Sequence, residues 1–100
     1  MKFLSQFDEF GENMGFPKMQ DYFQKEPYPG KEKIVEYLKN GTKTFAGLGI
    51  LKDVYTGEQI PIEQCGMTDG EYSWISDLYY YVEQYNLKLP EEFNEKVLKS

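Results

Sequence analysis

The sequence has no histidine and no arginine, since all eleven of its basic residues are lysines. The absence of histidine excludes Ser-His and Cys-His nucleophile activation and removes the commonest zinc ligand. Without arginine there is no bidentate clamp for phosphate or carboxylate. Cys65 is the single cysteine, so we expect no internal disulfide and a small buried apolar side chain there. Paired carboxylates are the remaining catalytic material, and we predict no enzyme activity, no metal site and no cofactor.

Long apolar runs are also missing. None approaches the roughly 18 residues that a membrane span needs. The N-terminal segment breaks its apolar character at Asp8 and Glu9, which is unlike a signal peptide, so we expect a cytoplasmic protein. The chain of 100 residues predicts a single domain over 1–100.

Positive charge is absent between Lys52 and Lys88, whereas the same window holds seven acidic residues. The window therefore carries a charge of −7 and the rest of the chain +1, which together give the net charge of −6. An acidic surface repels the phosphate backbone, so direct nucleic-acid binding is not expected. The imbalance favours a cationic partner, bound through an acidic face if the acids of the window gather on one side of the fold. The alternative, which the sequence leaves open, is that they scatter over several faces. The acids of the window are Asp53, Glu58, Glu63, Asp69, Glu71, Asp77 and Glu83.

Apolar spacing predicts three helices in the first part of the chain: over 2–10, from Pro17, and over 31–40. Gly11 and Gly41 stand where a glycine would end the first and third. The buried faces expected are Phe3, Leu4, Phe7 and Phe10, then Met19, Tyr22 and Phe23, then Ile34, Val35 and Leu38.

Residues 43–75 are rich in β-branched and aromatic residues and predict an antiparallel meander of three to four strands. Gly47 and Gly49 indicate a bulge or a division into two short strands, and Gly57 supplies a hairpin turn. Pro61 predicts that its strand is an edge or is bulged there. A second turn is expected over 68–70.

A further helix is predicted from an N-cap at Ser76 to about Asn86, and a last one opens at Pro90. Together these elements predict an α+β fold, with a small antiparallel sheet packed against N- and C-terminal helices. The inward residues expected are Leu78, Tyr81, Val82 and Tyr85, then Phe93, Val97 and Leu98.

Three consecutive tyrosines, 79–81, cannot all point inward on a helix, because neighbouring residues are about 100° apart. Exposed tyrosines beside acids are typical of a protein-binding face. The alternative is that Tyr79 and Tyr80 both pack under the N-terminal segment or the sheet. The candidate partner-binding residues are Asp69, Glu71, Tyr72, Asp77, Tyr79, Tyr80 and Glu83.

The C-terminal third, TDGEYSWISDLYYYVEQYNLKLPEEF, resembles immunity proteins of bacterial polymorphic toxin systems, including contact-dependent growth inhibition. The resemblance implies a protein that binds one cognate toxin domain and blocks its active site. Such toxins are frequently nucleases with basic clefts. It also implies that Asp69, Glu71 and Asp77 supply charge and that Tyr79 or Tyr80 is the anchor. The residues that carry the similarity are Asp69, Gly70, Tyr72, Trp74, Leu78, Tyr80, Tyr81, Val82, Leu89, Pro90 and Phe93.

Two other functions fit the same residues. One is a small adaptor or regulatory domain that binds another cytoplasmic protein. The other is an acidic nucleic-acid mimic that blocks a DNA-binding protein, which would space carboxylates like phosphates on one face. The sequence leaves the oligomeric state open.

Overall fold

The computed structural model describes residues 2–5, 7 and 16–99. Its mixed sheet has four strands in the order β1-β4-β3-β2. The strands β2 (Thr42–Lys52), β3 (Gln59–Thr68) and β4 (Tyr72–Ile75) pair antiparallel in chain order. The predicted meander and the α+β fold are therefore confirmed.

The prediction of a helix over 2–10 is wrong at its beginning, where Lys2–Phe3 form the short strand β1. This strand pairs in parallel with β4, and the N–H of Leu4 donates to the carbonyl of Ser73 at 2.7 Å. Residues 2–4 have the apolar spacing of a helix, but they form a strand because the free edge of β4 offers hydrogen-bond partners to their backbone. Residues 6 and 8–10, and the stop expected at Gly11, lie outside the described residues.

Both predicted turns of the meander are confirmed by glycines in the left-handed region, with φ of 77° at Gly57 and 101° at Gly70. Pro61 lies in a stretch of β3 where the register shifts, between the pairs Ile50↔Glu63 and Lys52↔Gln59. A proline is tolerated there because the ladder is already interrupted.

In the described part of the chain, four helical segments accompany the sheet. The first is a 3₁₀ helix, η2 (Met19–Tyr22), shorter than the helix predicted from Pro17. The α-helices are α1 (Lys31–Lys39), α2 (Leu78–Tyr85) and α3 (Glu91–Lys99).

Two predicted helix starts are off by one residue. The N-cap of α2 is Asp77 instead of Ser76, because the Ser76 hydroxyl is committed to β3. It donates to the carbonyl of Glu63 at 2.6 Å and accepts the N–H of Cys65 at 3.1 Å. Pro90 precedes α3 and its carbonyl accepts the first helical N–H groups. Asn86 ends α2 with φ of 56°, as predicted.

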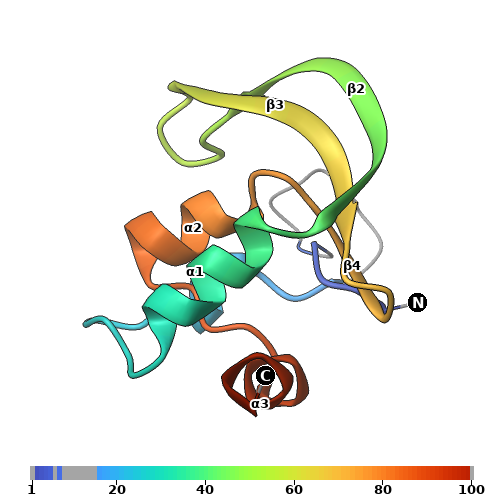
Figure 1. Ribbon diagram of the computed structural model, residues 1–100. Coiled ribbons are helices and arrows are strands. Elements are labelled where there is room, and N and C mark those ends of the chain that lie inside the picture. Colours follow the sequence, from blue (N-terminus) through green and yellow to red (C-terminus); the bar gives the residue numbers. More distant parts are fainter. Residues whose placement is uncertain (1, 6, 8–15, 100) are drawn as a thin grey trace.

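The β2–β3 ribbon extends well beyond β4 and curves over α2, while α3 lies at the opposite end of the molecule (Figure 1). The core lies between the sheet and the three α-helices, around Trp74, Tyr81 and Phe93. The buried faces of α1 and α2 match the prediction, except that Tyr85 is half-buried. Leu98 is 45% exposed, because the buried face of α3 falls on Phe93, Asn94 and Val97.

Candidate functional site

The seven acids of window 53–87 do not form one surface. Asp53 and Asp77 are buried, and the carboxylate of Asp69 is 8% exposed. Lysines from outside the window compensate others: Lys43 lies 3.5 Å from Glu63, Lys96 2.9 Å from Glu71, and Lys39 4.0 Å from Glu83. The acids of the window therefore do not form the acidic face expected from the charge imbalance, because folding buries some of them and brings lysines to others.

Asp53 is a buried carboxylate at the end of β2 that accepts four hydrogen bonds. Its Oδ1 accepts the N–H groups of Tyr55 at 2.7 Å and Thr56 at 3.2 Å. Its Oδ2 accepts the hydroxyls of Tyr80 at 2.7 Å and Tyr85 at 2.6 Å. Burial alone would raise the pKa of Asp53, but the two hydroxyls and two N–H groups hold it below its usual value. The same carboxylate raises the pKa of Tyr80 to about 12.

Aromatic rings surround this carboxylate and hold the tip of the β2–β3 ribbon on α2. Phe23 and Tyr85 stack with centroids 4.9 Å apart. The Tyr81 hydroxyl accepts the N–H of Val54 and donates to the carbonyl of Lys52, both at 3.2 Å. We call Asp53, Tyr80, Tyr81 and Tyr85 the Asp53 clamp, because their hydrogen bonds join the end of β2 to α2. The hydrogen bonds to Asp53 occupy both carboxylate oxygens and leave the carboxylate no proton-accepting role at neutral pH.

Asp69 is the centre of a second closed cluster, in the β3–β4 turn. Its Oδ2 accepts the Tyr37 hydroxyl at 2.6 Å and the Lys96 ammonium at 2.9 Å. Its Oδ1 accepts the N–H groups of Glu71 and Tyr72. Burial opposes ionisation, but these donors lower the pKa of Asp69 well below its usual value. The cluster fastens α1 and α3 to the turn, and Asp69 is not available to a partner.

Asp77 is 4% exposed, and among the described residues its Oδ1 has no hydrogen-bond partner. Burial raises its pKa to about 6. The predicted role of Asp77 as a charge presented to a partner is wrong, because the side chain is enclosed.

The predicted tyrosines divide in the same way. Tyr72 is buried and contacts Phe93 edge-on, with centroids 5.0 Å apart. The Tyr80 hydroxyl is committed to Asp53. Tyr79 is half-buried under the Lys39 ammonium, 5.0 Å from its ring centroid, and Lys39 also reaches Glu83. Of the candidate residues, Tyr79 and Glu83 lie together, while exposed Glu71 lies apart beside α3.

Exposed apolar side chains gather instead along the β2–β3 ribbon. Phe45 and Ile50 are 59% and 66% exposed, and Val54 and Tyr55 follow at the tip. We call these four residues the hairpin patch. The Phe45 ring lies over Gly66, where an added Cβ would collide with it. The patch thus includes a large apolar side chain, Phe45, that is exposed and lies against the backbone of Gly66.

The backbone of β2 is less available than its side chains, although it is the outer strand of the sheet. Its register shifts between Lys43 and Phe45 and again between Ala46 and Ile50. At the second shift the Gln64 side chain accepts the N–H of Gly49 at 2.8 Å. Bulges of this kind protect an edge from strand addition, so the ribbon offers side chains more than ladder hydrogen bonds.

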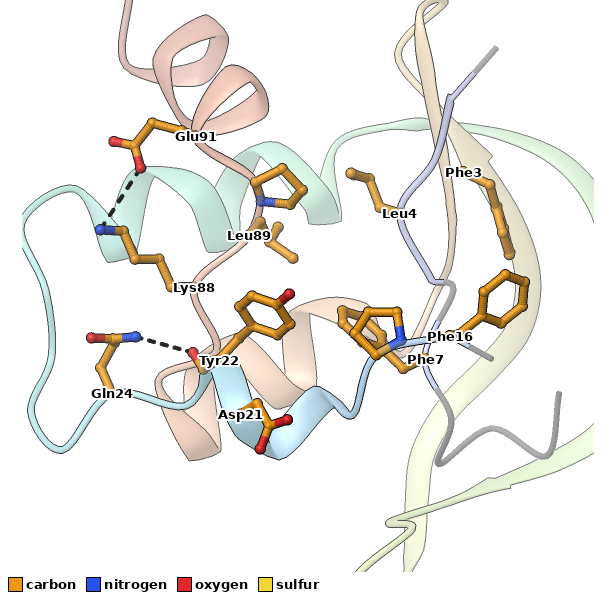
Figure 2. A pocket seen from close by; sticks show the side chains of 12 residues that line it. Phe3, Leu4, Phe7, Phe16, Asp21, Tyr22, Gln24, Lys88, Leu89 and Glu91 are labelled. Atoms are coloured by element: carbon orange, nitrogen blue, oxygen red, sulfur yellow. Dashed lines mark hydrogen bonds and ion pairs between the residues drawn. The ribbon is translucent and has the colours of Figure 1, made fainter. Parts of the chain in front are cut away.

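A cavity of about 550 Å³ lies between the N-terminal segment, η2 and the α2–α3 linker (Figure 2). Phe3 and Phe16 form one side of it, and Tyr22 lies opposite, below Leu89. Its volume falls within the range of small-ligand sites, about 300–1,000 Å³.

Comparisons with protein-family models, with curated proteins and with solved structures found no match. Among the helices in the described part of the chain, none combines the length and apolar character of a membrane span. Within residues 2–5, 7 and 16–99, no group of three or more Cys, Asp or Glu side chains is placed to hold a metal ion.

Sequence reasoning missed both the hairpin patch and the Asp53 clamp. The pattern from Asp53 to Gly57 contained a signal for the clamp, since an aspartate often accepts N–H groups two or three residues ahead in a turn. The hairpin patch had no comparable signal, because Phe45 and Ile50 have the composition of core residues.

Proposed function

We propose that this protein is a non-enzymatic inhibitor that binds another protein through the hairpin patch. The observation that carries the proposal is the concentration of exposed apolar side chains on one ribbon, led by Phe45 and Ile50. Large apolar side chains that are exposed on a folded surface are common anchors of protein interfaces, since their burial in a partner removes apolar area from water.

The partner that we propose is a toxin domain with a basic substrate cleft, neutralised in the cytoplasm by this chain as an immunity protein. The resemblance of the C-terminal third to such proteins supports this partner, and so does the net charge of −6. The charge acts over the whole molecule, so it steers a basic partner even though individual carboxylates are paired with lysines. Steering sets the association rate, and the hairpin patch sets the dissociation rate.

The test is binding to the C-terminal domain of the protein encoded next to this one, measured at two salt concentrations. We compare the parent chain with a double variant, Phe45→Thr with Ile50→Thr, which keeps residues that favour strands. The matched control is Leu98→Gln, which removes an exposed apolar side chain from α3, at the opposite end of the molecule.

We expect tight binding by the parent, binding at least about tenfold weaker by the double variant, and unchanged binding by Leu98→Gln. Association of the parent should slow as salt rises. Absence of binding at both salt concentrations would overturn the toxin partner. Equal affinity of the parent and a folded double variant would overturn the assignment of the hairpin patch.

A further inference from the structure

The cavity in Figure 2 is built from three separate segments and has a mostly apolar wall. The floor is the α2–α3 linker, which is fixed to the segment after η2 by backbone hydrogen bonds. The N–H of Lys88 donates to the carbonyl of Tyr22 at 3.0 Å, and Phe23 and Leu87 form an isolated β-bridge. Two of the walls of the cavity, η2 and the α2–α3 linker, are thus joined to each other by backbone hydrogen bonds.

Four aromatic side chains of the described residues line this cavity. Phe3 and Phe7 come from the N-terminal segment, Phe16 precedes η2, and Tyr22 ends η2. Phe3 and Tyr22 remain exposed although each belongs to a wall. The Tyr22 ring lies across the cavity from Phe3 and Phe16 and directs its hydroxyl toward the space between them (Figure 2).

The charged groups of the wall do not cancel. The Lys88 ammonium lies 3.8 Å from Glu91, so these two compensate each other. Among the described residues of the wall, Asp21 is the remaining charged one, and it takes part in no ion pair with any other described residue. Counted over the described residues, the wall therefore carries a net charge of −1.

We propose that this cavity binds an organic cation, specifically an alkylated ammonium group carried on a small apolar body. Aromatic faces attract such cations through their quadrupole, and an adjacent carboxylate adds direct attraction. The apolar body is accommodated by Leu4, Leu89 and Pro90. An anion would be repelled by Asp21, and a neutral ligand would gain neither the cation–π attraction nor the attraction to the carboxylate. This site is independent of the hairpin patch and of the partner proposed for it.

The experiment is a titration of the ¹⁵N-labelled full chain with choline, followed by backbone amide shifts. The comparison ligand is 3,3-dimethylbutan-1-ol, the neutral carbon analogue of choline, which has the same shape without the charge. We expect saturable shifts at Tyr22, Gln24 and Lys88 with choline, with a dissociation constant in the millimolar range, about −4 kcal/mol. The neutral analogue should bind at least about fivefold more weakly.

Two variants separate the parts of the site. Tyr22→Leu keeps an apolar side chain but removes the ring, and should weaken choline about fivefold. Asp21→Asn removes the charge at an exposed position and should weaken it about threefold. The control Glu95→Gln makes the same charge change on an exposed part of α3 and should leave the affinity unchanged.

The proposal is overturned if choline produces no saturable shifts up to about 100 mM, well beyond the expected millimolar range. It is equally overturned if the neutral analogue binds as tightly as choline, or if both variants bind choline like the parent. Shifts confined to residues 45–55 would place the ligand on the hairpin patch and also overturn it. Toxin binding by the parent tests the proposed function separately, because none of these variants alters the hairpin patch.

Discussion

Two buried aspartates with opposite surroundings illustrate how little a carboxylate's position in the sequence says about its role. Asp53 is enclosed by four donors, whereas Asp77 is enclosed with an oxygen that has no partner among the described residues. Ionisation of Asp53 therefore stabilises the fold, and ionisation of Asp77 destabilises it. Their pKa values move in opposite directions for this reason.

Replacement of Asp77 by asparagine should stabilise the protein at pH 7. The pKa of Asp77 is about 6 when folded and 3.8 ordinarily, so the folded state holds the proton more tightly. The protonated Asp77 carboxyl contributes its full stabilisation below pH 3.8, and this stabilisation is lost as pH rises through about 6. The loss in free energy of unfolding is at most about 3 kcal/mol. We expect Asp77→Asn to gain about 2 kcal/mol in urea unfolding at pH 7, after allowance for partial solvation. The gain should shrink toward zero at pH 3.8, and an equal gain at both pH values would contradict it.

Removal of either hydroxyl at Asp53 should destabilise the protein, most strongly at neutral pH. A hydrogen bond to a charged group contributes about 1.5–3 kcal/mol, so Tyr85→Phe and Tyr80→Phe should each cost about 2 kcal/mol. Because the pKa of Asp53 is lowered on folding, its stabilisation is present above the unfolded pKa and is lost as pH falls through the folded one. The cost should therefore fade in acid.

Unfolding of Tyr80→Phe and Tyr85→Phe can be followed by Trp74 fluorescence, because Trp74 is the single tryptophan and is buried. Tyr79→Phe is the matched control, since that residue lies on the same helix under Lys39 and away from Asp53. Equal losses in all three variants would show that the clamp at Asp53 contributes nothing specific.

The elements differ in how far the sequence could predict them. Helix α1 and the turn at Gly57 follow from local spacing and backbone chemistry, and both are confirmed. Strand β1 could not be predicted, because its partner Tyr72 lies about seventy residues away. The expectation of an acidic face was wrong for the same reason, because Lys96, distant in the sequence, pairs with Asp69 and Glu71. Local patterns predict elements, whereas the charge of a surface depends on which elements meet.

The junction between α1 and β2 depends on a close approach that only glycine permits. A Cβ at Gly41 would lie 2.7 Å from Cζ2 of the Trp74 ring and 3.2 Å from the carbonyl oxygen of Thr68. Trp74 is fully packed and donates to the carbonyl of Leu38, so it cannot move aside freely. We expect Gly41→Ala to cost about 1–3 kcal/mol in urea unfolding. Gly47→Ala is the control, since it meets the flexible end of Gln64 and should cost less.

At the scale of the whole molecule, paired carboxylates and a net charge of −6 have separate consequences. Ion pairs such as Lys39–Glu83 reduce the electrostatic potential close to the surface, because the two charges offset each other at short range. They leave the long-range field unchanged, because that field depends on the sum of charges. An inhibitor of this kind would attract a basic partner from a distance and bind it through apolar contact.

This separation predicts that charge changes far from the hairpin patch alter the rate of association and leave dissociation unchanged. Glu95→Lys brings the net charge from −6 to −4, and Lys99→Glu brings it to −8, both at exposed positions on α3. With the proposed toxin domain at low salt, the first should slow association and the second should accelerate it, each about two- to fivefold. Stopped-flow mixing at low and high salt measures both rates, and the difference should vanish at high salt because mobile ions screen the field. A change in dissociation alone would mean that α3 itself contacts the partner, and the hairpin patch would then be at most part of the interface.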